Sequence, residues 1–225
     1  TDLGRLFPDA AARHLECQDA SIRRGTRVRA IERPLAIDGE PFDHIVIATA
    51  PRHAASLLAG HPETAATAAM LSAYAHEPIG CAYLGYPDDI RLPEPMLGLE
   101  SVGHERLGQW AFDRGALGGP RGLVSFVLSA EGAWDRLDDD ALCRALHGEL
   151  EAALGRKLPS PRWQRVLRER RATFSCRPNL PRPAMQTALR GLWLAGDYVY
   201  ADYPGTLEGA VRSGIAAARG ILAAG

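Results

Sequence analysis

The sequence lacks long apolar runs, metal-binding cysteine spacings and any excess of charge of one sign. Its 225 residues carry a formal net charge of -1, so the chain has no positive excess that would attract nucleic acid. No apolar run approaches the roughly 18 residues of a membrane span, and the start Thr-Asp-Leu-Gly-Arg is unlike a signal peptide. The four cysteines lie far apart and form no Cys-x-x-Cys pair. We therefore expect a reduced, cytoplasmic protein with no resident metal.

Hydrophobic periodicity predicts an α/β (α+β) protein with a sizeable core, since 46% of the residues are hydrophobic. Helices are expected at 9–17, around 57, and at 63–75, 138–154 and 206–222. Strands are expected at 21–32, 42–50, 79–86, 96–99, 109–112, 123–128, 164–174 and 192–195. The middle strands are expected to form an antiparallel or mixed sheet.

Three local patterns predict details of these elements. The run Ile45–Ala48 is nearly continuously apolar, which is typical of a strand covered on both faces. Asp138–Asp140 stands at a helix start, where capping is favoured over metal binding. The basic segment Arg168–Arg171 is interpreted as plain surface.

The segment from Leu192 to Leu222 is the candidate ligand site. A short buried strand leads through Gly196 and Asp197 into a turn and then a helix, and the first N–H groups of a helix have no partner within it. Gly205 and further glycines in the helix would let a flat ligand or another backbone approach closely. Geometry alone leaves two interpretations open: a ligand site, or a structural strand–turn–helix with packing glycines.

The residue identities of this segment add a resemblance. Gly-Leu-Trp-Leu-Ala-Gly-Asp at 191–197, followed by Tyr-Pro-Gly-Thr-Leu-Glu-Gly-Ala-Val-Arg-Ser-Gly at 203–214, resembles the C-terminal FAD-binding motif of the flavin amine oxidase superfamily, which includes the phytoene desaturases. Its detailed form is similar to the hydroxysqualene dehydroxylase family. Segments 25–31, 45–51 and 171–178 match the same pattern. The middle, 56–165, matches only by the order and length of its elements.

The resemblance implies the C-terminal portion of a two-domain, amine oxidase-like fold. Residues 1–55 and 176–225 would be segments of the FAD-binding domain, and 56–175 a mixed-sheet substrate domain inserted between them. The family's first strand carries Gly-x-Gly-x-x-Gly for the pyrophosphate, whereas this sequence contains no Gly-x-Gly at all. We therefore expect the chain to lack half of its cofactor site.

The resemblance also implies roles for individual residues. Asp197 would bond the ribityl or phosphate part of FAD, the backbone at Thr206 and Leu207 would donate to the flavin pyrimidine edge, and Val28 would touch the adenine. The implied cofactor contacts are Val28, Ala48, Thr49, Gly196, Asp197, Pro204, Gly205, Thr206 and Leu207.

A proton donor is also needed, because hydroxide is a poor leaving group. We hypothesise that Tyr200, Asp202 or Tyr203 supplies or relays that proton. A flavin-facing wall and a packed aromatic turn remain equally open for this segment.

The function implied is FAD-dependent reductive dehydroxylation of hydroxysqualene to squalene, a step in hopanoid and squalene biosynthesis. The alternatives are a carotenoid or phytoene-type desaturase, a flavin amine oxidase, and a non-catalytic lipid-binding fragment. The partners expected are a long isoprenoid, the inner face of a membrane by peripheral contact, and a second copy of the fragment, but no nucleic acid.

Overall fold

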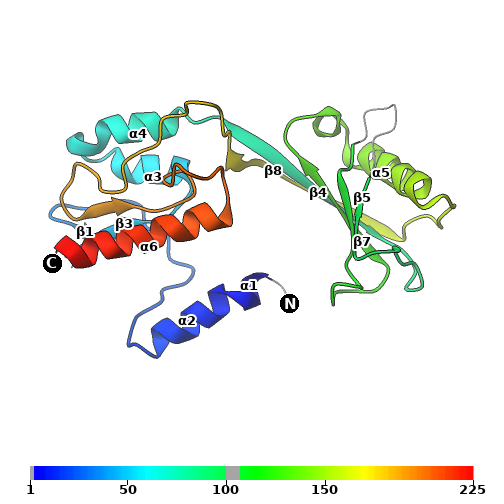
Figure 1. Ribbon diagram of the computed structural model, residues 1–225, viewed down its shortest axis with the longest axis horizontal. Helices are drawn as coiled ribbons and strands as arrows, with labels where there is room; N and C mark the ends of the chain where they lie inside the picture. Colours follow the sequence, from blue (N-terminus) through cyan, green and yellow to red (C-terminus); the bar gives the residue numbers. More distant parts are fainter. Residues whose placement is uncertain (1–2, 100–106, 225) are drawn as a thin grey trace. The chain divides into compact units, whose positions relative to one another are not determined.

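The structure, a computed structural model, describes residues 3–99 and 107–224 and is a mixed α/β protein, which confirms the predicted fold class (Figure 1). It divides into two compact units. Unit 1 comprises 1–23 and 77–172, and unit 2 comprises 24–76 and 173–225. The long segment of unit 1 is thus inserted between the two segments of unit 2.

Unit 1 is built on a five-stranded sheet in the order β5-β6-β7-β4-β8. These strands are β4 (His76–Gly85), β5 (Met96–Gly98), β6 (Trp110–Asp113), β7 (Leu123–Ser129) and β8 (Trp163–Phe174). From β5 to β4 each strand runs antiparallel to the next. The unit also contains α1 (Leu3–Leu6), α2 (Pro8–Glu16), the 3-10 helix η2 (Ala133–Arg136) and α5 (Asp139–Leu154).

The core of unit 1 lies on one face of this sheet. Leu84 and Phe126 point to that face and pack in one cluster with Leu142 and Leu146 of α5, all four side chains being fully buried. Since side chains alternate along a strand, the neighbouring residues project from the opposite face. Helix α5 therefore covers one side of the sheet, as its three- and four-residue apolar spacing predicts.

The opposite sheet face of unit 1 carries exposed apolar side chains. Register places Met96 opposite Phe112 and Trp110 opposite Val127 on this face. Trp163 of β8 is 50% exposed, and its ring lies directly over Gly85. We call the set Met96, Trp110, Phe112, Val127, Trp163 and Leu167 the apolar sheet face.

The structure confirms the predicted capping role of Asp138 at the start of α5. The Asp138 carboxylate accepts a hydrogen bond of 2.7 Å from the N–H of Ala141, and Gly155 ends the helix with a left-handed φ of 63°. The Asp138 hydrogen bond and the left-handed conformation of Gly155 explain why the helix begins and ends where the sequence predicts.

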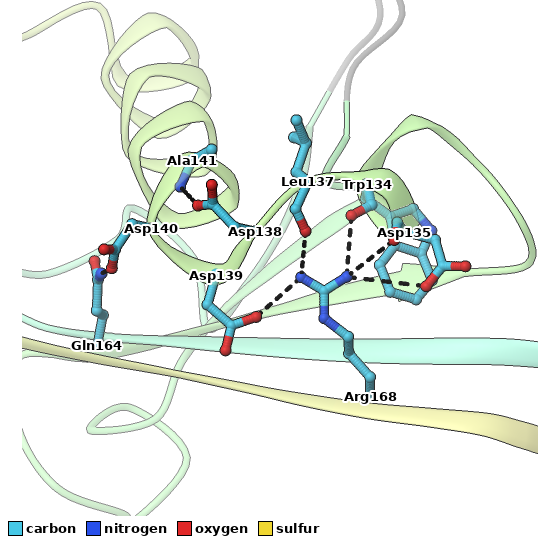
Figure 2. A network of polar contacts seen from close by, with 9 residues as sticks. All are labelled: Trp134, Asp135, Leu137, Asp138, Asp139, Asp140, Ala141, Gln164 and Arg168. Atoms are coloured by element: carbon cyan, nitrogen blue, oxygen red, sulfur yellow. Dashed lines mark hydrogen bonds and ion pairs between the residues drawn. The ribbon is translucent and has the colours of Figure 1, made fainter.

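Arg168 is not the plain surface residue that the sequence suggested. Its guanidinium donates to the carbonyls of Trp134 (3.2 Å) and Leu137 (2.8 Å) and pairs with the Asp139 carboxylate at 3.0 Å. Figure 2 shows it between the η2 segment and the start of α5. Its side chain is only 22% exposed, so Arg168 ties β8 to the beginning of α5.

Unit 2 is built around two short parallel strands, β3 (Ile45–Ile47) and β9 (Leu192–Leu194). The other elements are β1 (Ala36–Ile37), β2 (Glu40–Pro41), α3 (Pro51–Leu58), η1 (Pro62–Thr64), α4 (Ala65–Ser72) and α6 (Leu207–Ala224). Leu58 of α3 and Leu71 of α4 are fully buried in one cluster with Leu192 and Leu194. Both helices thus share a core with the parallel strands.

The prediction of a strand at 21–32 is wrong. The structure has only an isolated bridge there, from Glu32 to Ala36, and Gly25 turns the backbone with a φ of 69°. Alternating apolar residues give a strand only where a neighbouring strand takes up their hydrogen bonds.

The prediction that β3 is covered on both faces is also wrong, because Val46 is 40% exposed. In α6, the buried face consists of the small residues Gly209, Ser213 and Ala217. The larger Leu207, Val211, Ile215 and Leu222 form an exposed stripe. The helix is amphipathic as predicted, but small residues make its closest contacts with the rest of unit 2.

Candidate functional site

The carboxyl ends of β3 and β9 bring together two groups of predicted cofactor residues. The strands are parallel, with Ile47 opposite Leu194, and the N–H of Ala195 donates to the carbonyl of Ile47 at 3.0 Å. Ala48 and Thr49 therefore emerge at the same edge as Gly196 and Asp197. Ligands of open α/β sheets bind at this edge.

Gly196 makes the turn that leaves β9. Its φ of 154° is one that side-chain-bearing residues rarely adopt, and an added Cβ would lie 2.8 Å from Cδ1 of Tyr198. Its N–H donates to the hydroxyl of Ser213 at 2.7 Å, and that hydroxyl donates to the carbonyl of Ala210. The turn is thereby joined to the buried face of α6.

Asp197 follows this turn and is half-buried. Burial raises the pKa of its carboxyl, while the N–H of Tyr198 and the charge of Arg182 act in the opposite direction. The carboxylate lies beside Gly205, where an added Cβ would come within 3.3 Å of Oδ2 and 2.5 Å of the Thr173 hydroxyl. Glycine at 205 keeps the space next to this carboxylate open.

Thr206 caps the start of α6. Its hydroxyl accepts from the N–H of Gly209 at 3.1 Å, and its carbonyl accepts from the N–H of Ala210 at 3.1 Å. Leu207, the first residue of the helix, is 75% exposed. The amino end of α6, where the helix dipole is positive, is therefore open to a ligand.

The candidate proton donors differ in their surroundings. The rings of Tyr200 and Tyr203 lie 5.8 Å apart, and the guanidinium of Arg212 lies 5.4 Å from the Tyr203 ring centroid. Asp202 is exposed. The structure thus groups the two tyrosines around one arginine, and Pro204 follows them as an exposed residue of the same loop.

Hollows open in the described part of unit 2. One, of about 710 Å³, is lined by Val28 and Thr49 together with His53 and Ser56, so it joins two predicted adenine neighbours. Another, of about 730 Å³, lies at the amino ends of the strands near His44 and contains none of the predicted residues. The first lies at the carboxyl end of β3, because its lining includes Thr49, two residues beyond Ile47.

Sequence reasoning missed Arg182, whose guanidinium bonds backbone carbonyls of the turn between β9 and α6. No local signal marks it, since its partners lie 15 and 21 residues away. The hydroxyl of Tyr198 is also notable, because it is buried and has no hydrogen-bond partner in the structure described. Burial raises the pKa of this phenol, as does the nearby Asp197.

Within residues 3–99 and 107–224, no three His, Cys, Asp or Glu side chains gather to hold a metal ion. Over the same ranges, no helix has both the length and the apolar character needed to cross a membrane.

Comparison with known proteins identifies relatives over nearly the whole chain. The chain is 34% identical to a hydroxysqualene dehydroxylase of Rhodopseudomonas palustris over 243 residues, covering 99% of the chain and 52% of the relative. A hydroxysqualene dehydroxylase of Sinorhizobium fredii is 29% identical, with coverages of 96% and 50%. The chain thus spans about half the length of the curated relatives it matches.

Solved structures show the same fold at low sequence identity. A putrescine oxidase variant with redesigned cofactor binding superposes with a TM-score of 0.69 at 15% identity, covering 97% of this chain and 53% of that one. Reduced UDP-galactopyranose mutase superposes with a TM-score of 0.61 at 16% identity, covering 96% and 51%. The family model of the flavin containing amine oxidoreductases matches residues 5–222. The chain belongs to the family of flavin-containing amine oxidoreductases.

Proposed function

We propose that this chain supplies the substrate-binding domain and the C-terminal part of the FAD-binding domain of an FAD-dependent oxidoreductase. The reaction is the reductive dehydroxylation of hydroxysqualene to squalene. The observation that carries the proposal is the open site at the carboxyl ends of β3 and β9, with Asp197 and the amino end of α6 beside it. The names of the two curated relatives support the choice of substrate.

The residues of this edge fit part of an FAD molecule. Asp197 would bond the ribityl hydroxyls, which can donate to a carboxylate, in preference to a phosphate, whose negative charge would repel it. Thr206 and Leu207 would present backbone N–H groups to the pyrimidine edge. Val28 and Thr49 would contact the adenine side through the hollow they share.

Bound FAD in its reduced form would supply a hydride to an allylic carbon. In the overall reaction the C–O bond of the substrate breaks, a C–H bond forms, the flavin is oxidised and the hydroxyl leaves as water once it is protonated. We assign proton delivery to the group Tyr200, Asp202 and Tyr203. Arg212, beside Tyr203, would stabilise the negative charge left when a proton departs.

The apolar sheet face of unit 1 is proposed as a wall for the isoprenoid. Its exposed Met96, Trp110 and Trp163 offer the kind of apolar patch that marks a ligand or interaction surface. Each buried CH2 of a hydrocarbon contributes about 0.8 kcal/mol, so a C30 chain needs few polar contacts for affinity. The product is an apolar hydrocarbon, and we propose peripheral contact with the inner face of a membrane, where lipid can accept it.

Product analysis tests this function. The full-length protein with reduced FAD should convert hydroxysqualene to squalene, identified by mass. In a parallel reaction with oxidised FAD, a product that has lost two hydrogens and kept its hydroxyl would instead indicate a desaturase, in which the flavin accepts the hydride. Unchanged substrate in the presence of bound, reduced flavin would refute the assignment.

A further inference from the structure

Arg182 closes the loop between β9 and α6. Nη1 donates to the carbonyl of Asp197 at 2.8 Å, and Nη2 donates to the carbonyl of Tyr203 at 3.2 Å. Both acceptors belong to the main chain, so the contact fixes the path of the loop whatever its side chains are. One planar group thus holds the two ends of segment 197–203 together.

Aromatic residues of unit 2 hold the Arg182 side chain and its backbone in place. Its Cζ lies 4.7 Å from the centroid of the Phe174 ring, and Phe174 is buried against Tyr74 with their ring centroids 5.8 Å apart. The hydroxyl of Tyr74 donates to the carbonyl of Pro181, the residue before Arg182. The guanidinium is therefore stacked on the core of unit 2 and its backbone is anchored next to it.

The two carbonyls that Arg182 bonds lie beside the two predicted flavin contacts. Asp197 is itself the first, and Tyr203 stands three residues before Thr206, whose hydroxyl caps α6. The spacing between the Asp197 carboxylate and the amino end of α6 depends on the length and shape of this loop. A clamp across the loop fixes that spacing before any ligand arrives.

We propose that Arg182 is a positioning residue for FAD, which sets the distance between Asp197 and the amino end of α6 so that one flavin meets both. The inference rests on the proposed function, since it needs FAD at this edge. Lysine should not replace it, because a single ammonium cannot offer two coplanar N–H groups to carbonyls six residues apart. Lysine would still keep the positive charge above Phe174 and near Asp197. The Arg182→Lys variant therefore separates the effect of the two guanidinium hydrogen bonds from the effect of the charge.

The first arm of the test measures FAD binding by the full-length protein carrying Arg182→Lys, Arg182→Met or, as a matched control, Arg177→Met. Arg177 is an exposed arginine of the same segment. We expect both Arg182 variants to bind FAD at least about tenfold more weakly and to alter the visible flavin band, with the control within about twofold of the wild type. Wild-type affinity and an unchanged band in Arg182→Lys would overturn the inference.

The second arm needs no FAD and uses hydrogen exchange on the chain itself. In Arg182→Lys, the amides of 198–203 should exchange faster while those of β3 and β9 keep their protection. Equal acceleration in the loop and both strands would mean general destabilisation and would refute positioning. If the wild-type full-length protein binds no FAD, the proposed function fails and the proposed flavin role of Arg182 fails with it. The exchange result then separately decides whether Arg182 holds the loop.

Discussion

Replacing Gly196 with alanine should destabilise unit 2 by about 2–6 kcal/mol. The added Cβ would lie 2.8 Å from Cδ1 of Tyr198 and closer still to Cε1, whereas carbon atoms in contact prefer about 3.5–4.0 Å. Tyr198 is 1% exposed and packs in the core, so its ring has little room to retreat. Forcing an extra carbon into a packed core costs about 1–3 kcal/mol, and a φ of 154° adds about 1–3 kcal/mol for a residue other than glycine.

Gly214→Ala is the matched control for this change. Gly214 lies in α6, and nothing stands within 4 Å of the position its Cβ would take. Alanine is favoured over glycine within a helix, so this variant should gain about 0.5–1 kcal/mol.

Native-state hydrogen exchange of the β9 amides, compared with those of β7, gives the opening free energy of each unit separately. A Gly196→Ala variant within about 0.5 kcal/mol of the wild type at β9 would refute the reasoning. So would an equal loss of protection in β7, because the clash is confined to unit 2.

The structure also predicts the effects of changes at Asp197, at Arg168 and on the exposed stripe of α6. Asp197→Asn should raise the stability of unit 2 at neutral pH, because burial raises the carboxyl pKa in the folded state and the wild type therefore loses stability as the pH rises from about 4 through that pKa. Thermal unfolding should show a higher melting temperature for the variant at neutral pH and no difference below about pH 4. Arg168→Met should destabilise unit 1 by about 2–4 kcal/mol in urea unfolding, because the carbonyls of Trp134 and Leu137 and the Asp139 carboxylate lose the guanidinium that donates to them. A loss of stability no greater than that caused by Arg165→Met, at an exposed arginine of the same strand, would contradict this prediction. The chain alone should purify without flavin colour and self-associate through the α6 stripe, and Val211→Glu should restore a monomer in light scattering; a yellow, monomeric chain would count against both expectations.

Elements with strong local signals could be predicted from the sequence. Helix α5 has apolar residues at helical spacing between an Asp cap and a Gly stop, and β7 is a short apolar run between turns. The segment from β9 to α6 was found through its glycines and its motif. In each case the information lies within one continuous stretch of the chain.

What the sequence could not predict depends on partners far away in the chain. The apolar period of α6 shows that the helix is amphipathic, but not that Gly209, Ser213 and Ala217 make the inner face. Arg182 has no charged partner nearby in sequence, because its acceptors are backbone carbonyls. The alternation at 21–32 suggested a strand, yet no neighbouring strand pairs along it in the structure described.

The central claim, that the edge formed by β3 and β9 holds FAD through Asp197, is tested most directly by the flavin affinity of Asp197→Ala in the full-length protein. Asp43→Ala is the control, since Asp43 is an exposed aspartate just before the opposite end of β3. Loss of charge-assisted hydrogen bonds worth about 1.5–3 kcal/mol should weaken FAD binding by about tenfold to a hundredfold, with the control unchanged. Equal flavin content and affinity in wild type, Asp197→Ala and Asp43→Ala would contradict the claim.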